Sequence, residues 1–378
     1  MTEGEIKVIE AEVLQARRKI HLDILRIFAC LLVMYNHTSA FQSFKIILPP
    51  HNIPLIAISC ISKINVPCFF MISGILLIGR PMKLSKIVNR IFRILLILSF
   101  CTLFFYILRW ATQGIPFSME EFVHGLFSGK DTPWGVHLWF LYSYLGFLIC
   151  LPILTLIGDK IDKKLFIWIV TFHLLMATIF PLINIILNWN GKSGLELSLN
   201  FEIPLFSSNV FFYPLIGTYL EKNYSITKTK EKTMVCVGGG ISLFLIITTV
   251  ILIEYDGIVS GYGHSLIGLF ECIYVISVFL TVKSYLSKIK ISDRIHKMLK
   301  NISEATFGVY LLDPFLQRIC SFVVLKDVNQ AVDTSSFLNA MLWIGFSFII
   351  CTTIVIFWKW IVGKFDIILL QTLKISKR

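Results

Sequence analysis

The sequence has few charged residues, and this shortage decides the class of protein. Charged side chains make up 15% of the 378 residues, whereas a soluble domain carries roughly 25%. The nine cysteines are scattered, nearly all of them inside apolar runs, and none are spaced as C-x-x-C. A water-soluble enzyme, a disordered chain and a secreted disulfide scaffold are therefore excluded, and neither a structural zinc site nor any other metal is expected.

Long apolar runs fill most of the chain. Hydrophobic residues make up 56% of it, and the mean hydropathy is +0.77. A helix needs about 20 apolar residues to cross a bilayer core. The sequence predicts ten such helices, at 21–43, 53–79, 91–112, 137–157, 165–188, 203–221, 234–254, 263–282, 304–325 and 337–362. We therefore expect an all-α, polytopic transmembrane helical bundle of about ten spans.

The basic residues mark the orientation of this bundle. Most of the 35 Lys and Arg residues fall in alternate connections between the runs. Cytoplasmic loops carry such an excess, so both termini are expected in the cytoplasm and the protein in the inner or plasma membrane. The net charge of +12 then reflects topology, and no nucleic-acid partner is expected. We divide the chain into an amphipathic interfacial segment (1–19), a transmembrane domain (20–364) and a basic cytoplasmic tail (365–378).

The first run carries polar residues that a membrane helix should not tolerate. Asp23, Arg26 and His37 all lie in it, although a charge near a helix centre costs roughly 2.5–3.5 kcal/mol. An eleven-residue spacing places Arg26 and His37 within about 20° of one face and about 16 Å apart along the axis. Arg26 has an alternative interpretation as an interfacial ion pair, and His37 as a neutral ring bonded to a neighbouring helix.

The third run opens with a pair of arginines. Arg90 and Arg93 are three residues apart, so they share one side of a helix at the predicted cytoplasmic face. Guanidinium pairs bind phosphate groups in bidentate fashion, which favours a phosphate-bearing ligand. The alternative is that both arginines only mark topology, because every inner loop is basic.

Other runs carry weaker signals. Ser73 and Gly74 permit a kink and a close helix approach in the second run. Trp139 follows His137 at an outer interface, where an aromatic belt is an equal alternative. Glu271 interrupts the eighth run and is expected to face the bundle interior.

Five short patterns occur in order along the chain. They are R-x10-H in the first run, N-V-P-C-F-F-M-I-S-G in the second, R-x-x-R opening the third, H-L-W-F-L at the fourth and S-E-A-T-F-G-V-Y-L-L-D-P near the ninth. Together, over residues 18–362, they resemble the acyltransferase-3 family of integral membrane O-acyltransferases. The resemblance implies a ten-helix domain in membrane lipid that transfers an acyl group, usually acetyl, from cytoplasmic acetyl-CoA. The implied acceptor is a hydroxyl of a surface or secreted glycan or of a lipid-linked sugar.

The resemblance also implies roles for individual residues. His37 would be the general base or an acyl relay, and Arg26 would hold the thioester end of the donor or stabilise developing charge. Arg90 and Arg93 would hold the CoA phosphates. One position departs from the pattern: the ninth motif commonly ends Y-L-x-H-P, and Asp313 replaces that histidine. We interpret Asp313 as a supporting polar group.

A transporter is the competing class. A bundle with an intramembrane Arg-His stripe could instead import an amino acid or translocate a lipid-linked sugar. Acetyl-CoA turnover discriminates between the two classes, because only the acyltransferase releases CoA.

Overall fold

The computed structural model describes most of the chain and consists of helices. The described residues are 20–38, 53–79, 83–128, 132–190, 208–224, 228–256, 270–287, 289, 291–325 and 336–375. Within them every regular element is helical, which confirms the all-α prediction. The expected interfacial segment 1–19 lies outside the described residues.

A helix forms within each of the ten expected runs. In chain order the elements are α2 (Ile20–Asn36), α4 (Ile53–Ser62), α5 (Asn65–Leu77), α6 (Leu84–Gln113), α7 (Met119–Ser128), the short 3₁₀ helix η1 (Val136–Leu138), α8 (Trp139–Lys160), α9 (Lys163–Leu174), the π-helical turn η2 (Leu175–Ile179), α10 (Phe180–Trp189), α12 (Asn209–Asn223), α13 (Lys228–Asp256), α15 (Glu271–Ser287), α16 (Asp293–Cys320), the π-helical turn η5 (Ser321–Leu325) and α17 (Phe337–Ile375).

Three local features differ from the sequence-based picture. The second run breaks into α4 and α5 at Lys63 and Ile64, and Pro67 lies in the first turn of α5, where its missing N–H costs little. The helix of the ninth run begins earlier than expected, because α16 starts at Asp293 and continues through Pro314 to Cys320. The last helix, α17, continues to Ile375 and so includes most of the expected tail.

Six described helical stretches are long and apolar enough to cross a bilayer. They are Ile53–Leu77, Leu84–Gln113, Val136–Lys160, Lys163–Asn184, Thr229–Thr248 and Phe337–Val362. The described parts of α2, α12 and α15 are shorter, and α16 carries many charged residues. The protein is therefore a helical membrane protein, while the count of ten spans and the cytoplasmic termini stay predictions.

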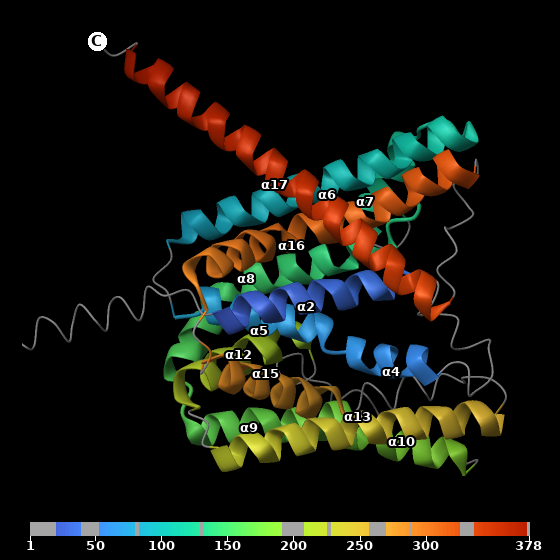
Figure 1. Ribbon diagram of the computed structural model, residues 1–378, viewed down its shortest axis with the longest axis vertical. Coiled ribbons are helices and arrows are strands. Elements are labelled where there is room, and N and C mark those ends of the chain that lie inside the picture. Colours follow the sequence, from blue (N-terminus) through green and yellow to red (C-terminus); the bar gives the residue numbers. More distant parts are fainter. Residues whose placement is uncertain are drawn as a thin grey trace, which may run out of the picture.

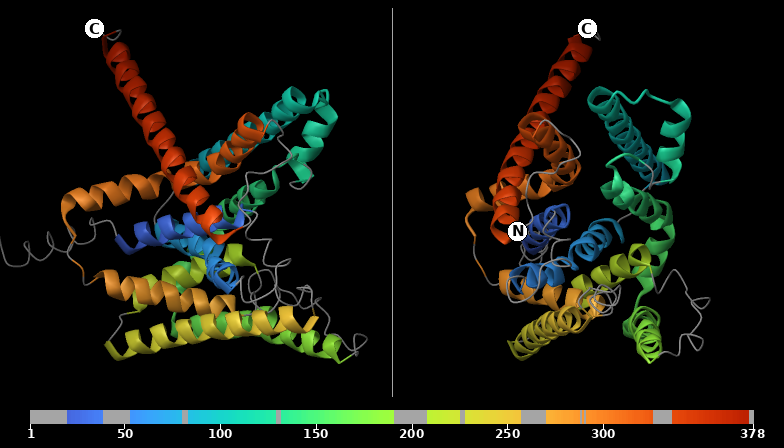
Figure 2. Two further views of the ribbon diagram at one scale, coloured as in Figure 1. Left: turned by 45° about the vertical axis from the view of Figure 1, so that its right-hand side comes forward. Right: turned by 90° about the vertical axis from the view of Figure 1, so that its right-hand side faces the viewer.

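Helix α2 occupies the centre of the bundle. It contacts α4, α5, α15, α16 and α17, so the polar residues of the first run face other helices. Figure 1 shows α6, α16 and α17 on one side of α2, and α9, α10 and α13 on the other. In the turned views of Figure 2, α2 again lies inside the bundle, and α17 crosses its surface and projects beyond it.

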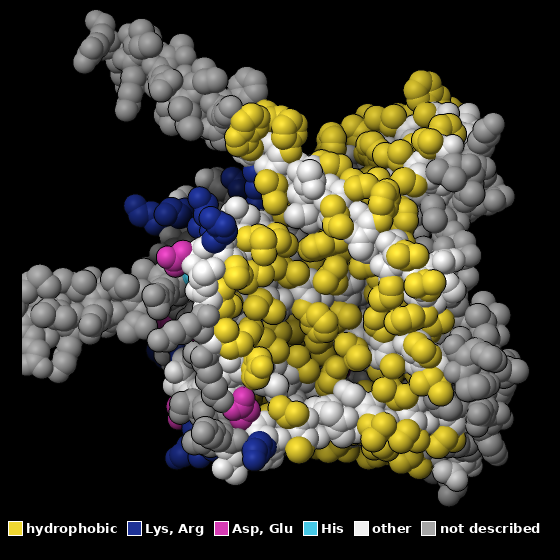
Figure 3. Space-filling model, viewed as in Figure 1, with side chains coloured by type: hydrophobic (Ala, Val, Ile, Leu, Met, Phe, Trp, Pro, Cys, Tyr) yellow, Lys and Arg dark blue, Asp and Glu magenta, His cyan; other side chains and the backbone are white. Residues whose placement is uncertain are grey.

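The outer surface is apolar. Large hydrophobic side chains are exposed on the peripheral helices, among them Phe92 and Phe100 of α6, Trp168 of α9 and Ile349 of α17. Figure 3 shows hydrophobic side chains covering the middle of the face, with Lys and Arg gathered at the edge where α6 and α16 begin. An exposed apolar surface of this extent fits contact with lipid, and the basic edge fits the predicted inner side.

Helices α5 and α12 approach each other at two glycines. A Cβ on Gly74 would lie 2.2 Å from the carbonyl oxygen of Pro214. A Cβ on Gly217 would lie 2.8 Å from the carbonyl oxygen of Met71. Real Cβ atoms do not come this close, so both positions require glycine. The expected close helix approach at Gly74 is thus present, and it fixes α5 within the core.

Replacement of Gly74 by alanine is expected to destabilise the protein by about 1–3 kcal/mol, because the backbone of α12 must move. The thermal midpoint of unfolding in detergent measures this effect. The matched control is Gly146→Ala in α8, where a Cβ would meet nothing within 4 Å. Equal midpoints for the two variants would contradict the packing described here.

Candidate active site

Helices α2 and α16 lie side by side in one register. The Arg26 Nη1 donates to the Ser303 Oγ at 3.5 Å, and the His37 Nδ1 lies 3.0 Å from the Asp313 Oδ2. These pairs are 277 and 276 positions apart in the sequence. Because the two separations are nearly equal, the two helices run parallel. The polar face of α2, with Arg26 and His37, therefore lies against a polar face of α16, with Ser303 and Asp313.

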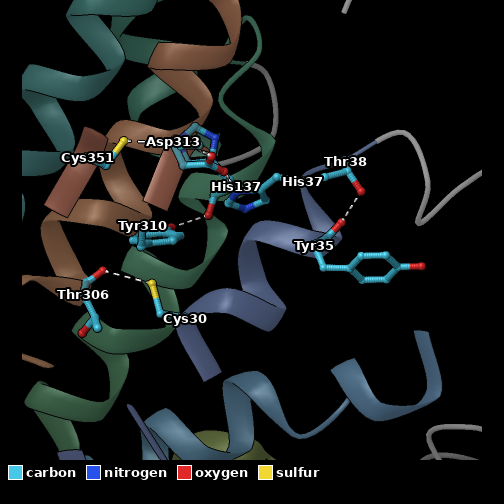
Figure 4. A network of polar contacts seen from close by, with 10 residues as sticks. Cys30, Tyr35, His37, Thr38, His137, Thr306, Tyr310, Asp313 and Cys351 are labelled. Atoms are coloured by element: carbon cyan, nitrogen blue, oxygen red, sulfur yellow. Dashed lines mark hydrogen bonds and ion pairs between the residues drawn. The ribbon is translucent and has the colours of Figure 1, made fainter. Parts of the chain in front are cut away.

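Asp313 is a buried carboxylate held from two sides. Its side chain is 1% exposed, and its Oδ2 bonds to the His37 ring. The Ser347 hydroxyl of α17 donates to the other carboxylate oxygen at 2.6 Å. Figure 4 shows His37 and Asp313 facing each other across α2 and α16. The residue that departs from the family pattern is therefore the direct partner of His37.

This pairing determines what the His37 ring can do. A carboxylate beside Nδ1 favours the tautomer with the proton on Nδ1, which leaves the lone pair of Nε2 for an incoming hydroxyl. The same carboxylate stabilises the imidazolium that forms once Nε2 takes a proton. His37 and Asp313 thus have the geometry of a general base with its orienting group.

A cavity of about 1000 Å³ opens beside this pair. Side chains from several helices line it, and they include six of the residues predicted from the sequence: Arg26, His37, Ser73, Arg90, Arg93 and Trp139. The fold therefore brings the R-x10-H and R-x-x-R pairs to one cavity, although α4 and α5 lie between α2 and α6 in the sequence. Four guanidinium groups, those of Arg26, Arg90, Arg93 and Arg318, and two imidazoles line this cavity, which suits it to an anionic ligand.

The other predicted residues lie outside the described lining of the cavity. Asp23 is 2% exposed and lies in the first turn of α2. Its negative charge there interacts favourably with the positive end of the helix dipole. Glu271 accepts a hydrogen bond from the Tyr213 hydroxyl at 3.1 Å, so it faces α12. Gly74 packs against Pro214. We assign these three residues to the support of the bundle.

Sequence reasoning missed two residues beside His37. The His137 ring centroid lies 5.7 Å from that of His37, and the Tyr310 ring centroid lies 6.2 Å from it. The Tyr310 hydroxyl donates a hydrogen bond to the His137 carbonyl. Both residues stand in the quoted motifs, but a lone histidine near a tryptophan also fits an aromatic belt. Their role emerges only from the contacts.

No group of three or more His, Cys, Asp and Glu side chains could hold a metal ion within the described part of the chain. The absence of a metal requirement stays a prediction.

An apolar exterior around a cavity lined by charged side chains defines a membrane protein with an internal polar site. The acyltransferase domain of the acyltransferase-3 family matches residues 20–361, nearly the whole chain. The chain belongs to this family and is a membrane acyltransferase, as its motifs predicted. No curated protein and no solved structure matches the chain.

Replacement of Asp313 by asparagine is expected to lower acyl transfer by about 10²- to 10⁴-fold. The amide can still accept a bond from Nδ1, but it cannot stabilise an imidazolium by charge. Acyl transfer by the purified protein measures the loss, and the elution volume on gel filtration shows whether the variant folds.

Ser347→Ala provides the comparison for this variant. It removes one hydrogen bond to the same carboxylate and leaves the charge in place, so the loss of transfer is expected to be smaller. Wild-type activity in Asp313→Asn would show that the carboxylate only packs α2 against α16.

Proposed function

We propose that this acyltransferase moves an acetyl group from acetyl-CoA, bound from the cytoplasmic side, to a hydroxyl of a cell-surface or secreted glycan. One observation supports the proposal above all others. The cavity that contains the His37 ring also contains Arg26, Arg90 and Arg93. A site for the phosphates of a donor and a base for an acceptor hydroxyl therefore share one space.

The spacing within the cavity fits a donor with a long arm. Arg93 precedes Phe105 on α6 by twelve residues, or about 18 Å along the axis. The Phe105 ring centroid lies 5.6 Å from that of His137 and so marks the level of the reacting groups. In CoA a flexible arm separates the charged nucleotide from the thioester, and a ligand of this shape can reach from Arg93 to His37.

The transfer reaction follows from this placement. The His37 Nε2 takes the proton of the acceptor hydroxyl as its oxygen attacks the thioester carbonyl carbon. A C–O bond forms, the C–S bond breaks, and the CoA sulfur leaves with the proton from His37. Asp313 stabilises the positive ring between the two proton transfers. No covalent acyl-enzyme is required, so we favour the base over the acyl relay for His37.

The spacing along α2 argues against both roles considered for Arg26, at the thioester end of the donor and on the developing charge. The Cα atoms of Arg26 and His37 are about 16 Å apart along α2, which is too far for both to act on one carbonyl. Arg26 instead bonds to Ser303 and lines the same cavity as the Arg90 and Arg93 pair. We assign Arg26 to donor binding.

The two substrates would enter from opposite ends. Arg318 lines the cavity five residues beyond Asp313 on α16, about 8 Å further from the start of that helix. The arginines proposed to bind the donor lie at the opposite end of the cavity, toward the predicted cytoplasmic side. His37 and Asp313 lie toward the other side. This arrangement suits an acetyl group that leaves cytoplasmic CoA and reaches a glycan outside an inner or plasma membrane.

Arg90→Ala and Arg93→Ala are each expected to weaken acetyl-CoA binding by about 10- to 100-fold, because each removes charge-assisted bonds worth about 1.5–3 kcal/mol. The dissociation constant of acetyl-CoA, measured by isothermal titration calorimetry, checks this. Lys83→Ala and Lys86→Ala are the controls, since both lysines are exposed on the same helical segment and neither is among the described lining residues.

Equal losses from all four variants would show a general effect of surface charge. A wild-type protein that binds no acetyl-CoA and releases no CoA would favour the transporter class. In that case a substitution of His37 would alter uptake of a solute and not acyl transfer.

A further inference from the structure

His137 presents an unbonded ring nitrogen beside the His37–Asp313 pair. The residue is 8% exposed and lines the cavity. Its Nε2 atom is buried and has no hydrogen-bond partner among the described residues. An unsatisfied buried polar atom costs about 1–3 kcal/mol, so a partner is expected from a ligand in the cavity.

The His137 ring is held rigidly in this position. Tyr310 donates to its carbonyl oxygen, and the rings of Phe105 and Phe315 pack against the imidazole with centroids 5.6 and 6.4 Å away. The preceding turn is strained, because Trp134 has a φ of 53°, which a bulky residue rarely adopts. Such strain persists where the surrounding structure fixes a functional geometry.

The strained turn also determines the tautomer of His137. The backbone of Trp134 lies beside the ring and favours a proton on the nitrogen that faces it. Since Nε2 has no partner among the described residues, we take this nitrogen to be Nδ1. The Nε2 atom therefore carries a lone pair and can only accept a hydrogen bond.

Two rings, each with an Nε2 atom that has no described hydrogen-bond partner, thus line one cavity at the point of reaction. The Nδ1 of His37 is bonded to Asp313, and the ring of His137 lies beside the backbone of Trp134. The two ring centroids are 5.7 Å apart. A ligand that satisfies both atoms has two neighbouring hydroxyl donors.

We propose that the acceptor is a vicinal diol of a sugar ring, with His137 as the residue that positions it. His37 takes the proton of one hydroxyl, and the adjacent hydroxyl donates a hydrogen bond to the Nε2 of His137. This inference rests on the proposed function and adds the substrate class. It disfavours an isolated primary hydroxyl, which leaves the His137 lone pair unsatisfied. It also excludes His137 as an oxyanion donor, since a lone pair repels developing negative charge.

Simple alcohols test the inference without knowledge of the natural glycan. The probes are cis- and trans-1,2-cyclohexanediol and, without the second hydroxyl, cyclohexanol. Acetyl-ester formation from acetyl-CoA gives kcat/KM for each, corrected for the two hydroxyls of the diols. We expect the wild type to prefer one of the diols about tenfold over cyclohexanol. His137→Phe keeps the ring shape and removes the acceptor, so it should abolish the preference and leave acetyl-CoA binding unchanged.

His173→Phe is the matched control. His173 is buried and stacks on Phe212 with centroids 3.5 Å apart, and it is not among the described lining residues. This variant should keep the diol preference. A wild type without diol preference, or His137→Phe with the full preference, would overturn the inference and leave the proposed function standing. A wild type that acetylates none of the alcohols and releases no CoA would overturn both.

Discussion

A carboxylate in the apolar interior of a membrane protein must be compensated, and the bond between Asp313 and His37 supplies that compensation. An unpaired buried charge costs several kcal/mol, so the side chain holds its partners in place. The bond joins the end of α2 to the last third of α16, and the Ser347 hydroxyl links α17 to the same carboxylate. Two of the helices that line the cavity, α2 and α16, are thus tied together at the point where the proposed chemistry occurs.

The remaining features of the site follow from this alignment. With α2 and α16 parallel and in register, Arg26 lies at one level of the bundle and His37 at another. The arginines of α6 line the same cavity, and His137 comes from the turn before α8. The arginines proposed to bind the donor are therefore separated along the bundle from the proposed acid–base groups. A catalyst with substrates on the two sides of a membrane requires such a separation.

The sequence predicted much of this arrangement because its signals are local. Apolar runs give helices, and an eleven-residue spacing places Arg26 and His37 on one face. It could not predict the pairing of His37 with Asp313, since the two residues are 276 positions apart and join only when α2 packs on α16. His137 was placed at an aromatic interface for the same reason. Its unbonded nitrogen depends on the strained turn at Trp134, which no periodicity encodes.

The central claim is that the His37 ring moves a proton during acyl transfer, and His37→Gln tests it most directly. An amide can replace a hydrogen bond to Asp313, but it cannot accept a proton at neutral pH. Turnover of acetyl-CoA with an acetylated acceptor should be lost in this variant, while the protein folds and binds acetyl-CoA as the wild type does. A His37→Gln protein that keeps most of its transfer activity would show that His37 only holds α2 to α16.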